Sequence, residues 1–340
     1  MSVEKSAATV DRRVSVAPMM DWTDRHCRYF LRGFSPRALL YTEMVTAAAI
    51  ARGDRARLLR FSPQEQPLAL QLGGSDPAQL ATAARYGEEL GYIEINLNCG
   101  CPSDRVHAGA FGACLMRQPQ RVAECVAAMR AAVSVPVTVK MRIGVLEAQS
   151  ARGSIRDYDE SDYDRLRSFT AAVAAAGCDA VIVHARKAML GGLSPRENRA
   201  VPPLRFDVVR RLKREFGTLT VVVNGGLRTA GEVEAALQWC DGAMLGREAY
   251  HRPYVLSELH EHLDGGGWKR PGAALILERM AAYAEREVAR GEPLGSITRH
   301  MLGLFAGQPG ARRYRQLLSE GARQHVDAAG LLREAAALAA

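Results

Sequence analysis

The stretch that decides the fold is LALQLGGSDPAQLATAARYGEELGYIEINLN, residues 68–98. It starts with an apolar run, Leu68–Leu72, and closes with a second one, Tyr92–Leu97. Between them lies a helical pattern, Pro77–Leu90, whose start is marked because Ser75-Asp76 places a capping side chain directly before a proline. A strand, a helix and a second strand in this order predict a parallel βαβ unit.

The same alternation extends over the first 250 residues. Strands of a parallel sheet that are covered on both faces are apolar throughout, and eight of them alternating with helices predict a closed (β/α)8 TIM barrel of the α/β class. An open doubly wound sheet is the alternative, but the first turn, Ala17–Asp21, lacks G-x-G-x-x-G and no Walker A lysine occurs. The remaining predicted strands are Val14–Ala17, Leu39–Tyr41, Val135–Lys140, Ala180–His184, Leu219–Val223 and Gly242–Leu245, and the remaining predicted helices are Arg121–Val133, Tyr163–Ala176, Phe206–Phe216 and Ala230–Trp239.

The last quarter of the chain has a different pattern. After Gly265–Gly267 the sequence is helical in character and rich in Ala, Leu, Glu and Arg. We therefore expect two domains, a catalytic barrel over residues 1–255 and a small α-helical domain over residues 256–340.

Composition narrows the class of protein. The chain has 340 residues, a net charge of +8 and seven cysteines. No apolar run approaches the roughly 18 residues of a membrane span, and Met1–Arg13 lacks the apolar core of a signal peptide, so we expect a cytoplasmic protein with free thiols. The positive charge suits a polyanionic partner such as nucleic acid, and an ordinary basic enzyme is the alternative.

Polar residues follow almost every predicted strand. Barrel enzymes build their sites at the carboxyl ends of the strands, so this pattern predicts a polar ligand site at that mouth. In chain order, the strand ends carry Pro18, Met19 and Met20, then Glu43, Gln71, Asn98, Lys140 with Arg142, His184 with Arg186 and Lys187, Asn224, Gly225 and Gly226, and finally Gly246 with Arg247.

Two glycine-bearing loops follow the seventh and eighth strands, Asn224–Gly226 and Gly246–Arg247. Barrels frequently bind phosphate with these two loops, because glycine lets backbone N–H groups approach closely and arginine adds charge. The alternative is that the glycines merely turn the chain. We predict a phosphate-bearing ligand.

Three further strand ends suit a planar ring. Gln71, Lys140 and His184 are placed to surround it, and a lysine stabilises the negative charge that reduced flavin carries near N1. Each residue taken alone is explained by structure. Taken together with the two glycine loops, they favour FMN as the ligand.

The stretch NLNCGCPS, residues 96–103, places two cysteines one glycine apart after a strand. This spacing is not that of a zinc knuckle or a redox pair, and no companion pair follows, so we predict no metal. A catalytic thiol at the barrel mouth is the preferred interpretation.

Nine segments together carry a resemblance to a known family. They are Ala17–Asp24, Leu68–Gly74, Asn96–Val106, Gly109–Met116, Val137–Lys140, Ile182–Lys187, Asn224–Gly226, Gly191–Asn198 and Met301–Arg312. The first seven resemble the tRNA-dihydrouridine synthases, and the last two resemble their A subfamily.

This resemblance implies an FMN-bound barrel that reduces the C5–C6 bond of uridine in the D loop of tRNA, at positions 20 and 20a. The reductant implied is NADPH, with NADH as the alternative. The reactive cysteine of Gly-Cys-Pro corresponds to Cys101, whereas Cys99 is expected to be a passenger. The implied cofactor contacts are Pro18, Met19, Met20, Gln71, Lys140, His184, Asn224, Gly225, Gly226, Gly246 and Arg247.

The reaction itself indicates what the site must contain. Hydride arrives at C6, and a proton must then reach C5 from the opposite face. A thiol with an ordinary pKa near 8.5 is protonated at neutral pH, whereas carboxylates are ionised, so Cys101 is predicted as the proton donor. Asn98 is predicted to position the base, together with Lys140 or Arg186.

A monomer that binds the D loop and elbow of tRNA, without a protein partner, is expected. The predicted tRNA contacts are Asn98, Arg142, Arg186, Lys187, Arg299, His300, Arg312 and Arg313. Two other readings stay open: an FMN-dependent reductase of small pyrimidines such as dihydroorotate, and a non-catalytic RNA-binding barrel. The polar segment 146–164 is long for the family at this place. We interpret it as a surface insertion, with a lid or an RNA contact as alternatives.

Overall fold

The computed structural model describes residues 10–103, 109, 111–147, 157–264, 267–324 and 327–337. Four parts of the sequence predictions lie outside these ranges: residues 104–106 of the cysteine motif, residue 110 of the segment Gly109–Met116, residues 148–156 of the predicted insertion, and residues 265 and 266 of the glycine linker.

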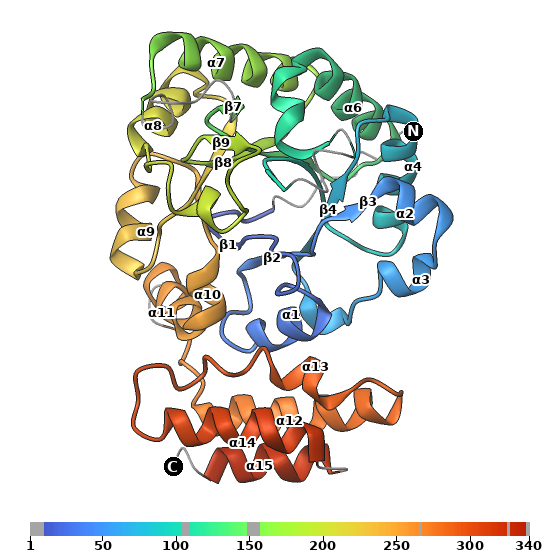
Figure 1. Cartoon of the computed structure of the whole chain (residues 1–340), viewed down its shortest axis with the longest axis vertical. Coiled ribbons are helices and arrows are strands. Elements are labelled where there is room, and N and C mark those ends of the chain that lie inside the picture. Colours follow the sequence, from blue (N-terminus) through green and yellow to red (C-terminus); the bar gives the residue numbers. More distant parts are fainter. Residues whose placement is uncertain are drawn as a thin grey trace.

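Eight parallel strands close into a barrel (Figure 1). Each pairs with the next along the chain, and the first pairs with the last, Val14 of β1 lying opposite Ala243 of β11. The predicted (β/α)8 barrel is confirmed, and the open sheet is excluded. The barrel strands are β1 (Val14–Val16), β2 (Leu39–Tyr41), β4 (Leu68–Gly73), β5 (Glu94–Cys99), β6 (Val137–Arg142), β8 (Ala180–His184), β10 (Thr220–Asn224) and β11 (Gly242–Leu245).

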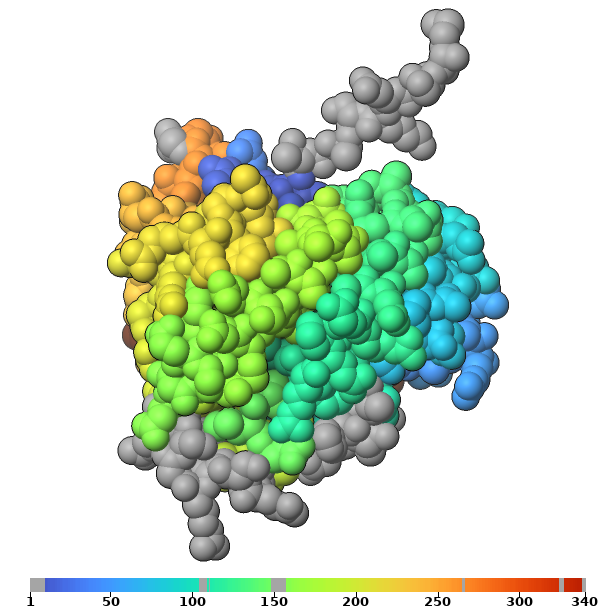
Figure 2. Space-filling model, turned by 90° about the horizontal axis from the view of Figure 1, so that it is seen from above, coloured from blue at the N-terminus to red at the C-terminus, as the bar shows by residue number. Residues whose placement is uncertain are grey.

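Helices cover the outside of the barrel, and those predicted from sequence are present. The Asp76 side chain accepts a hydrogen bond from the Gln79 N–H at 2.8 Å and caps α4, while Thr229 and Glu232 form the capping box of α9. Figure 2 shows α6, α7 and α8, coloured green to yellow, side by side on the outer wall. The helices are α1 (Arg25–Leu31), α2 (Ala47–Arg52), α3 (Arg55–Leu58), α4 (Pro77–Glu89), α6 (Pro119–Ala132), α7 (Glu160–Ala175), α8 (Phe206–Glu215), α9 (Ala230–Leu237), α10 (Arg247–His251) and α11 (Tyr254–Leu263).

Short elements decorate the loops. Strand β3 (Val45–Thr46) extends the sheet beside β4, and β7 (Val145–Glu147) pairs with β9 (Ala188–Leu190). Among the residues that the structure describes, 3-10 helix is found at Pro63–Glu65, Gly112–Arg117 and Glu197–Arg199.

The barrel interior has an apolar cluster of its own. Side chains alternate across a strand, so every second residue faces the lumen. Leu39, Ala69, Ile182, Val222 and Met244, from five different strands, meet there and are separate from the larger core between strands and helices. The remaining lumen is filled by polar side chains from β4, β5 and β6, which are described below.

The C-terminal helices form a layer beside the barrel (Figure 1). They are α12 (Ala273–Ala289), α13 (Leu294–Thr298), α14 (Ala311–Gln324) and α15 (Ala328–Ala337), and α13 packs on α1. Helix α11 packs instead on α9 and α10, which belong to the barrel. On packing grounds we propose that the predicted domain boundary at residue 255 moves to the segment between α11 and α12. Within the described ranges, no helix is both long enough and apolar enough to cross a membrane.

Candidate active site

Strand pairing brings the predicted mouth residues into one ring. Asn98 lies opposite Lys140 in the pairing of β5 with β6, and His184 of β8 lies opposite both Arg142 and Asn224. Because these positions share the lumen-facing phase of their strands, their side chains converge at the carboxyl end of the barrel.

The thiol loop is held in place by Asn98. Its Oδ1 accepts hydrogen bonds from the backbone N–H groups of Gly100, at 3.1 Å, and Cys101, at 3.0 Å. Cys101 is partly exposed, and its Sγ lies 3.6 Å from the hydroxyl of Ser103. Cys99 is fully buried in the outer core, and burial raises the pKa of its thiol well above the ordinary value. The two cysteines therefore face different surroundings.

Lys140 connects this loop to the first glycine loop. Its Nζ donates a hydrogen bond to Asn224 Oδ1 at 3.0 Å, and Asn224 Nδ2 donates to the carbonyl of Met244 at 2.8 Å, which fixes the amide orientation. Burial lowers the pKa of Lys140 to about 7, and the positive charge of Arg142 acts in the same direction. The Cys101 sulfur is close enough to interact with Lys140 electrostatically. One ammonium group thus lies between the thiol and the predicted phosphate grip.

Packing requires glycine in that grip. A Cβ on Gly225 would lie 2.6 Å from His184 Cδ2, and the residue has a φ of +113°. A Cβ on Gly226 would lie 2.3 Å from Leu204 Cδ1. Packing against His184 and Leu204, together with the positive φ of both residues, therefore favours glycine at both positions.

His184 completes the ring as a neutral imidazole. Burial lowers the pKa of His184 well below its ordinary value, and Arg142 and Lys140 lower it further. A neutral imidazole can both donate and accept a hydrogen bond, which suits a ring with mixed polar edges.

Gln71 is buried below the mouth. Its Nε2 donates to Asn96 Oδ1 at 2.7 Å, and its Oε1 accepts from Asn98 Nδ2 at 2.8 Å. Both amide groups are therefore held in fixed orientations beneath the thiol loop.

The loop after β1 reaches the same opening. The Met19 N–H donates to the Thr23 hydroxyl at 2.8 Å, which closes the turn that contains Pro18, Met19 and Met20. Met20 is 55% exposed, and the Met19 sulfur lies 3.8 Å from where a Cβ of Gly246 would be. The first and last strand loops thus meet.

The Arg142 guanidinium is occupied by backbone carbonyl groups of the loops around the mouth. Its guanidinium donates to the carbonyl of Gly100 at 3.1 Å, and to the carbonyls of Lys187, at 3.2 Å, and Asn198, at 2.9 Å. It is only 3% exposed, so it ties three loops of the mouth together rather than offering a free charge to tRNA.

Lys187 is also occupied. Its Nζ forms a buried ion pair with Asp162 of α7 and donates to the carbonyl of Asp157 at 2.6 Å. Both partners lie in the described end of segment 146–164, so this part of the predicted insertion anchors α7. Lys187 was expected to contact tRNA, whereas in the structure its Nζ is held by Asp162 and by the carbonyl of Asp157.

Arg199 is a site residue that sequence reasoning missed. It lies near Cys101 and Arg247, and its Nε is buried with no hydrogen-bond partner in the described structure. Burial lowers the pKa of Arg199, and Arg247 lowers it further. The signal was available, because Arg199 follows directly on the Gly191–Asn198 motif. Arg186, whose guanidinium donates to the carbonyl of Pro202, and the exposed Arg247 complete this cationic side of the mouth.

The other predicted tRNA contacts belong to the C-terminal helical layer. Arg299 forms an ion pair with Asp24 at 2.6 Å, and His300 Nε2 lies 2.9 Å from the same Asp24 oxygen, which joins the helical layer to α1. His300 is 1% exposed. Arg312 and Arg313 are exposed at the start of α14.

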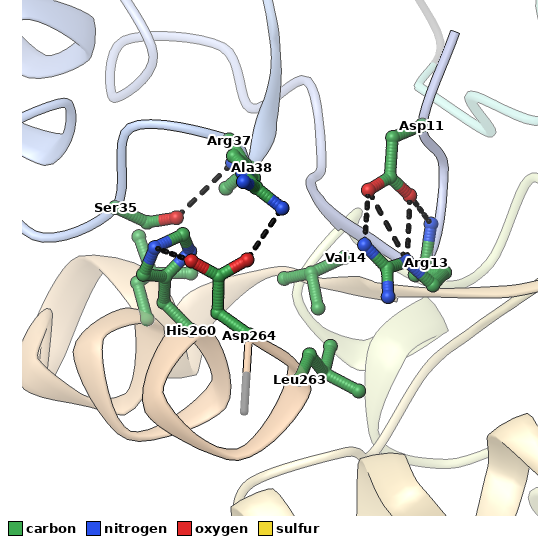
Figure 3. A pocket seen from close by; sticks show the side chains of 10 residues that line it. Asp11, Arg13, Val14, Ser35, Arg37, Ala38, His260, Leu263 and Asp264 are labelled. Atoms are coloured by element: carbon green, nitrogen blue, oxygen red, sulfur yellow. Dashed lines mark hydrogen bonds and ion pairs between the residues drawn. The ribbon is translucent and has the colours of Figure 1, made fainter. Parts of the chain in front are cut away.

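A small hollow at the opposite end of the barrel is not a second candidate active site (Figure 3). Its basic side chains already have partners, Arg13 with Asp11, and both Arg37 and His260 with Asp264. The lining comes from the start of β1, from the residues just before β1 and β2, and from α11, at the end of the barrel that its enzymes use for stability. In the described residues, no cluster of three His, Cys, Asp or Glu side chains could hold a metal ion.

Comparison with known proteins agrees with this geometry. The family described as dihydrouridine synthase matches residues 15–340. The chain belongs to the dihydrouridine synthase family. It is 56% identical to the tRNA-dihydrouridine(20/20a) synthase of Xanthomonas axonopodis pv. citri, over 95% of this chain and 92% of that protein. It is 51% identical to the proteins of the same name from Vibrio cholerae, over 94% and 93%, and Escherichia coli K12, over 94% and 90%.

Dihydrouridine synthases are flavin-dependent oxidoreductases that act on tRNA, and the residues of the mouth fit a phosphate-bearing flavin. The glycine cradle, residues 224–226, presents backbone that carries no Cβ at Gly225 and Gly226, and Lys140 offers a half-buried basic group whose described hydrogen-bond partner is a neutral amide. Arg199 adds a buried N–H group without a partner. Each of these groups is better satisfied by an anionic, hydrogen-bonding ligand than by the protein alone.

Proposed function

We propose that this member of the family reduces uridines 20 and 20a in the D loop of tRNA to 5,6-dihydrouridine, with FMN as cofactor and NADPH, or alternatively NADH, as reductant. One observation carries the proposal: the Gly-Cys-Pro loop and the glycine cradle share one barrel mouth and are linked by Lys140. The names of the close relatives support the two positions.

Residues of the protein itself supply the proton donor and hold it in position. Bound FMN would supply the hydride for C6 of the base. Cys101 then donates its Sγ proton to C5, because thiols are protonated at neutral pH and this one is partly exposed at the mouth. Asn98 fixes the backbone that leads into the thiol residue, and Lys140 with Arg186 offers positive charge to the oxygen on which negative charge develops.

The proposed cofactor contacts are the glycine loops, Lys140, His184, Gln71 and the Pro18–Met20 turn. For RNA, we propose Arg186, Arg312 and Arg313, and we reassign four residues. Arg142 and Lys187 hold the mouth loops and α7, and Arg299 with His300 holds the helical layer against Asp24. A monomer in the cytoplasm stays part of the proposal.

A matched pair of cysteine variants tests the chemistry. Cys101→Ala should keep bound flavin and its reduction by NADPH, while dihydrouridine formation on unmodified tRNA falls by a factor of about 100 to 10,000. Cys114→Ala, at the other partly exposed thiol of the described chain, should retain turnover. Products are mapped by mass spectrometry. Full turnover by Cys101→Ala contradicts the assignment of the acid, and turnover of free uracil or dihydroorotate in place of tRNA favours the small-molecule reaction.

The RNA surface is tested by salt dependence. The double variant Arg312→Ala, Arg313→Ala should weaken tRNA binding and reduce the slope of log K against log salt by about 2, since each phosphate contact contributes about 0.9. Flavin content should not change. Arg214→Ala, at an exposed position on α8, is the control. An unchanged slope in the double variant places the RNA elsewhere.

A further inference from the structure

A chain of buried hydrogen bonds runs down the lumen from the thiol loop to the opposite end of the barrel. Asn98 Nδ2 donates to Gln71 Oε1, and Gln71 Nε2 donates to Asn96 Oδ1. Asn96 Nδ2 donates to the Thr138 hydroxyl at 2.9 Å, and that hydroxyl donates to Glu94 Oε1 at 2.7 Å. Glu94, Asn96 and Thr138 are completely buried. The chain covers roughly 13 Å, since Glu94 and Asn98 are four strand residues apart.

The direction of this chain is fixed at its upper end. The Asn98 atom that accepts two backbone N–H groups must be its oxygen, so its amide nitrogen faces Gln71. Gln71 must then present its oxygen upward and its nitrogen downward to Asn96. The same reasoning turns the Asn96 nitrogen toward Thr138, whose single proton is left for Glu94.

The lower end fixes the same direction independently. Glu94 Oε1 also accepts a hydrogen bond from the Tyr41 hydroxyl at 2.5 Å, and Glu94 Oε2 lies 2.6 Å from an Arg12 nitrogen. A carboxylate accepts and does not donate, so every group around Glu94 must donate to it. Both ends therefore specify one arrangement of all the amides between them.

We propose that Thr138 and Glu94 are positioning residues for the active site: by setting the direction of the chain, they hold Gln71 and the Cys101 loop in the arrangement that the reaction uses. They act through other residues and touch neither substrate nor cofactor. The proposal deepens the proposed function, because its effect on turnover rests on Cys101 as the acid.

Loss of the Thr138 hydroxyl would remove the lower of the two constraints on this direction and leave only the backbone N–H groups at Asn98 to hold it. The Asn96 amide would keep a buried N–H without an acceptor, and turning the amide over would place two N–H groups against each other at Gln71. If Gln71 turned as well, the same conflict would arise at Asn98. The Asn98 oxygen would then be drawn away from the Gly100 and Cys101 N–H groups, and the thiol loop would loosen.

The test uses three threonine variants of the full-length protein as isolated. Thr138→Val keeps the shape and removes the hydroxyl, and Thr138→Ser restores it. Thr170→Val is the matched control, because Thr170 is also completely buried and its hydroxyl donates to the carbonyl of Leu166 at 2.8 Å in α7, away from the chain. The readout is the rate at which iodoacetamide alkylates Cys101, followed by mass spectrometry of its peptide.

Thr138→Val should raise the Cys101 alkylation rate about fivefold, and kcat on tRNA should fall with little change in KM. Thr138→Ser and Thr170→Val should both stay close to the parent protein. A parent-like rate in folded Thr138→Val, or an equal rise in Thr170→Val, overturns the proposal. If Thr138→Val does not fold, Thr138→Ala, which also lacks the hydroxyl, carries the same expectation, and a parent-like rate there overturns it. Alkylation needs no turnover, so this proposal and the assignment of Cys101 as the acid can fail separately.

Discussion

Replacing Lys140 by methionine should stabilise the cofactor-free protein at neutral pH and lose that advantage in alkali. The lysine is buried at the mouth, where its Nζ has the neutral amide of Asn224 as its partner and the charge of Arg142 nearby. Burial, and then Arg142, lower the pKa of Lys140 from its ordinary value of 10.5 to about 7. Keeping an ionisable lysine at this site therefore lowers stability, a trade-off that is common where function demands a basic group away from water.

The sign and size follow from proton linkage. Between pH 10.5 and about 7 the unfolded chain binds a proton at this lysine that the folded protein does not, so stability falls as the pH falls. At about 1.4 kcal/mol for each pH unit, the cost grows from near zero at pH 10.5 to about 5 kcal/mol at pH 7. Methionine removes this cost, but it leaves Asn224 Oδ1 without its hydrogen-bond donor. That loss reduces the gain in unfolding free energy by about 1–3 kcal/mol.

Urea unfolding at several pH values between 7 and 10 measures the difference. Lys140→Met should be more stable than the parent by about 2–4 kcal/mol at pH 7 and less stable at pH 10. Lys269→Met, at an exposed lysine between α11 and α12, should show a difference that does not vary with pH. A constant gap between Lys140→Met and the parent across this range would refute the reasoning.

Two further substitutions test the cradle and the link between the domains. Gly225→Ala should destabilise the protein by about 1–3 kcal/mol and lower its flavin content, because Gly225 has a positive φ and a Cβ there would collide with His184. Gly231→Ala, which has open space around it in α9, should instead stabilise the protein by about 0.5–1 kcal/mol. Thermal melts measure the stability of both variants, and flavin absorbance measures their cofactor content. Asp24→Asn should lower stability by about 2 kcal/mol at neutral pH. Burial raises the pKa of Asp24, but the contacts with His300 and Arg299 outweigh burial and hold that pKa well below 3.8. The stability difference between Asp24→Asn and the parent should therefore shrink in acid, as the parent carboxylate takes up its proton. A stability difference that is the same at pH 7 and in acid contradicts this role.

Local pattern predicted the fold well because each strand and helix carries its own signal. The barrel strands of the structure overlap all eight predicted runs, although β5 begins at Glu94 rather than at Tyr92, whose side chain packs in the outer core. The mouth residues were predicted for the same reason, since the end of a parallel strand fixes the place of its last side chain in space.

The ion-pair and hydrogen-bond partners of individual side chains could not be predicted from local pattern. Lys187 and Asp162 are 25 residues apart, and His300 and Asp24 are 276 apart, so no local spacing connects them. Both cations were therefore interpreted as free to bind RNA. The lumen chain was missed because polar residues such as Glu94 and Asn96 sit inside a run that is otherwise apolar, and their value depends on Thr138 in the next strand.

Asp24 has two duties that are usually given to separate residues. One carboxylate oxygen caps the first turn of α1, through the N–H groups of His26 and Cys27, while the other holds Arg299 and His300 of the helical layer. Anything that detaches the layer therefore also frays the helix beneath it. The barrel and its C-terminal layer should consequently melt as one cooperative body, with a single calorimetric transition in place of two.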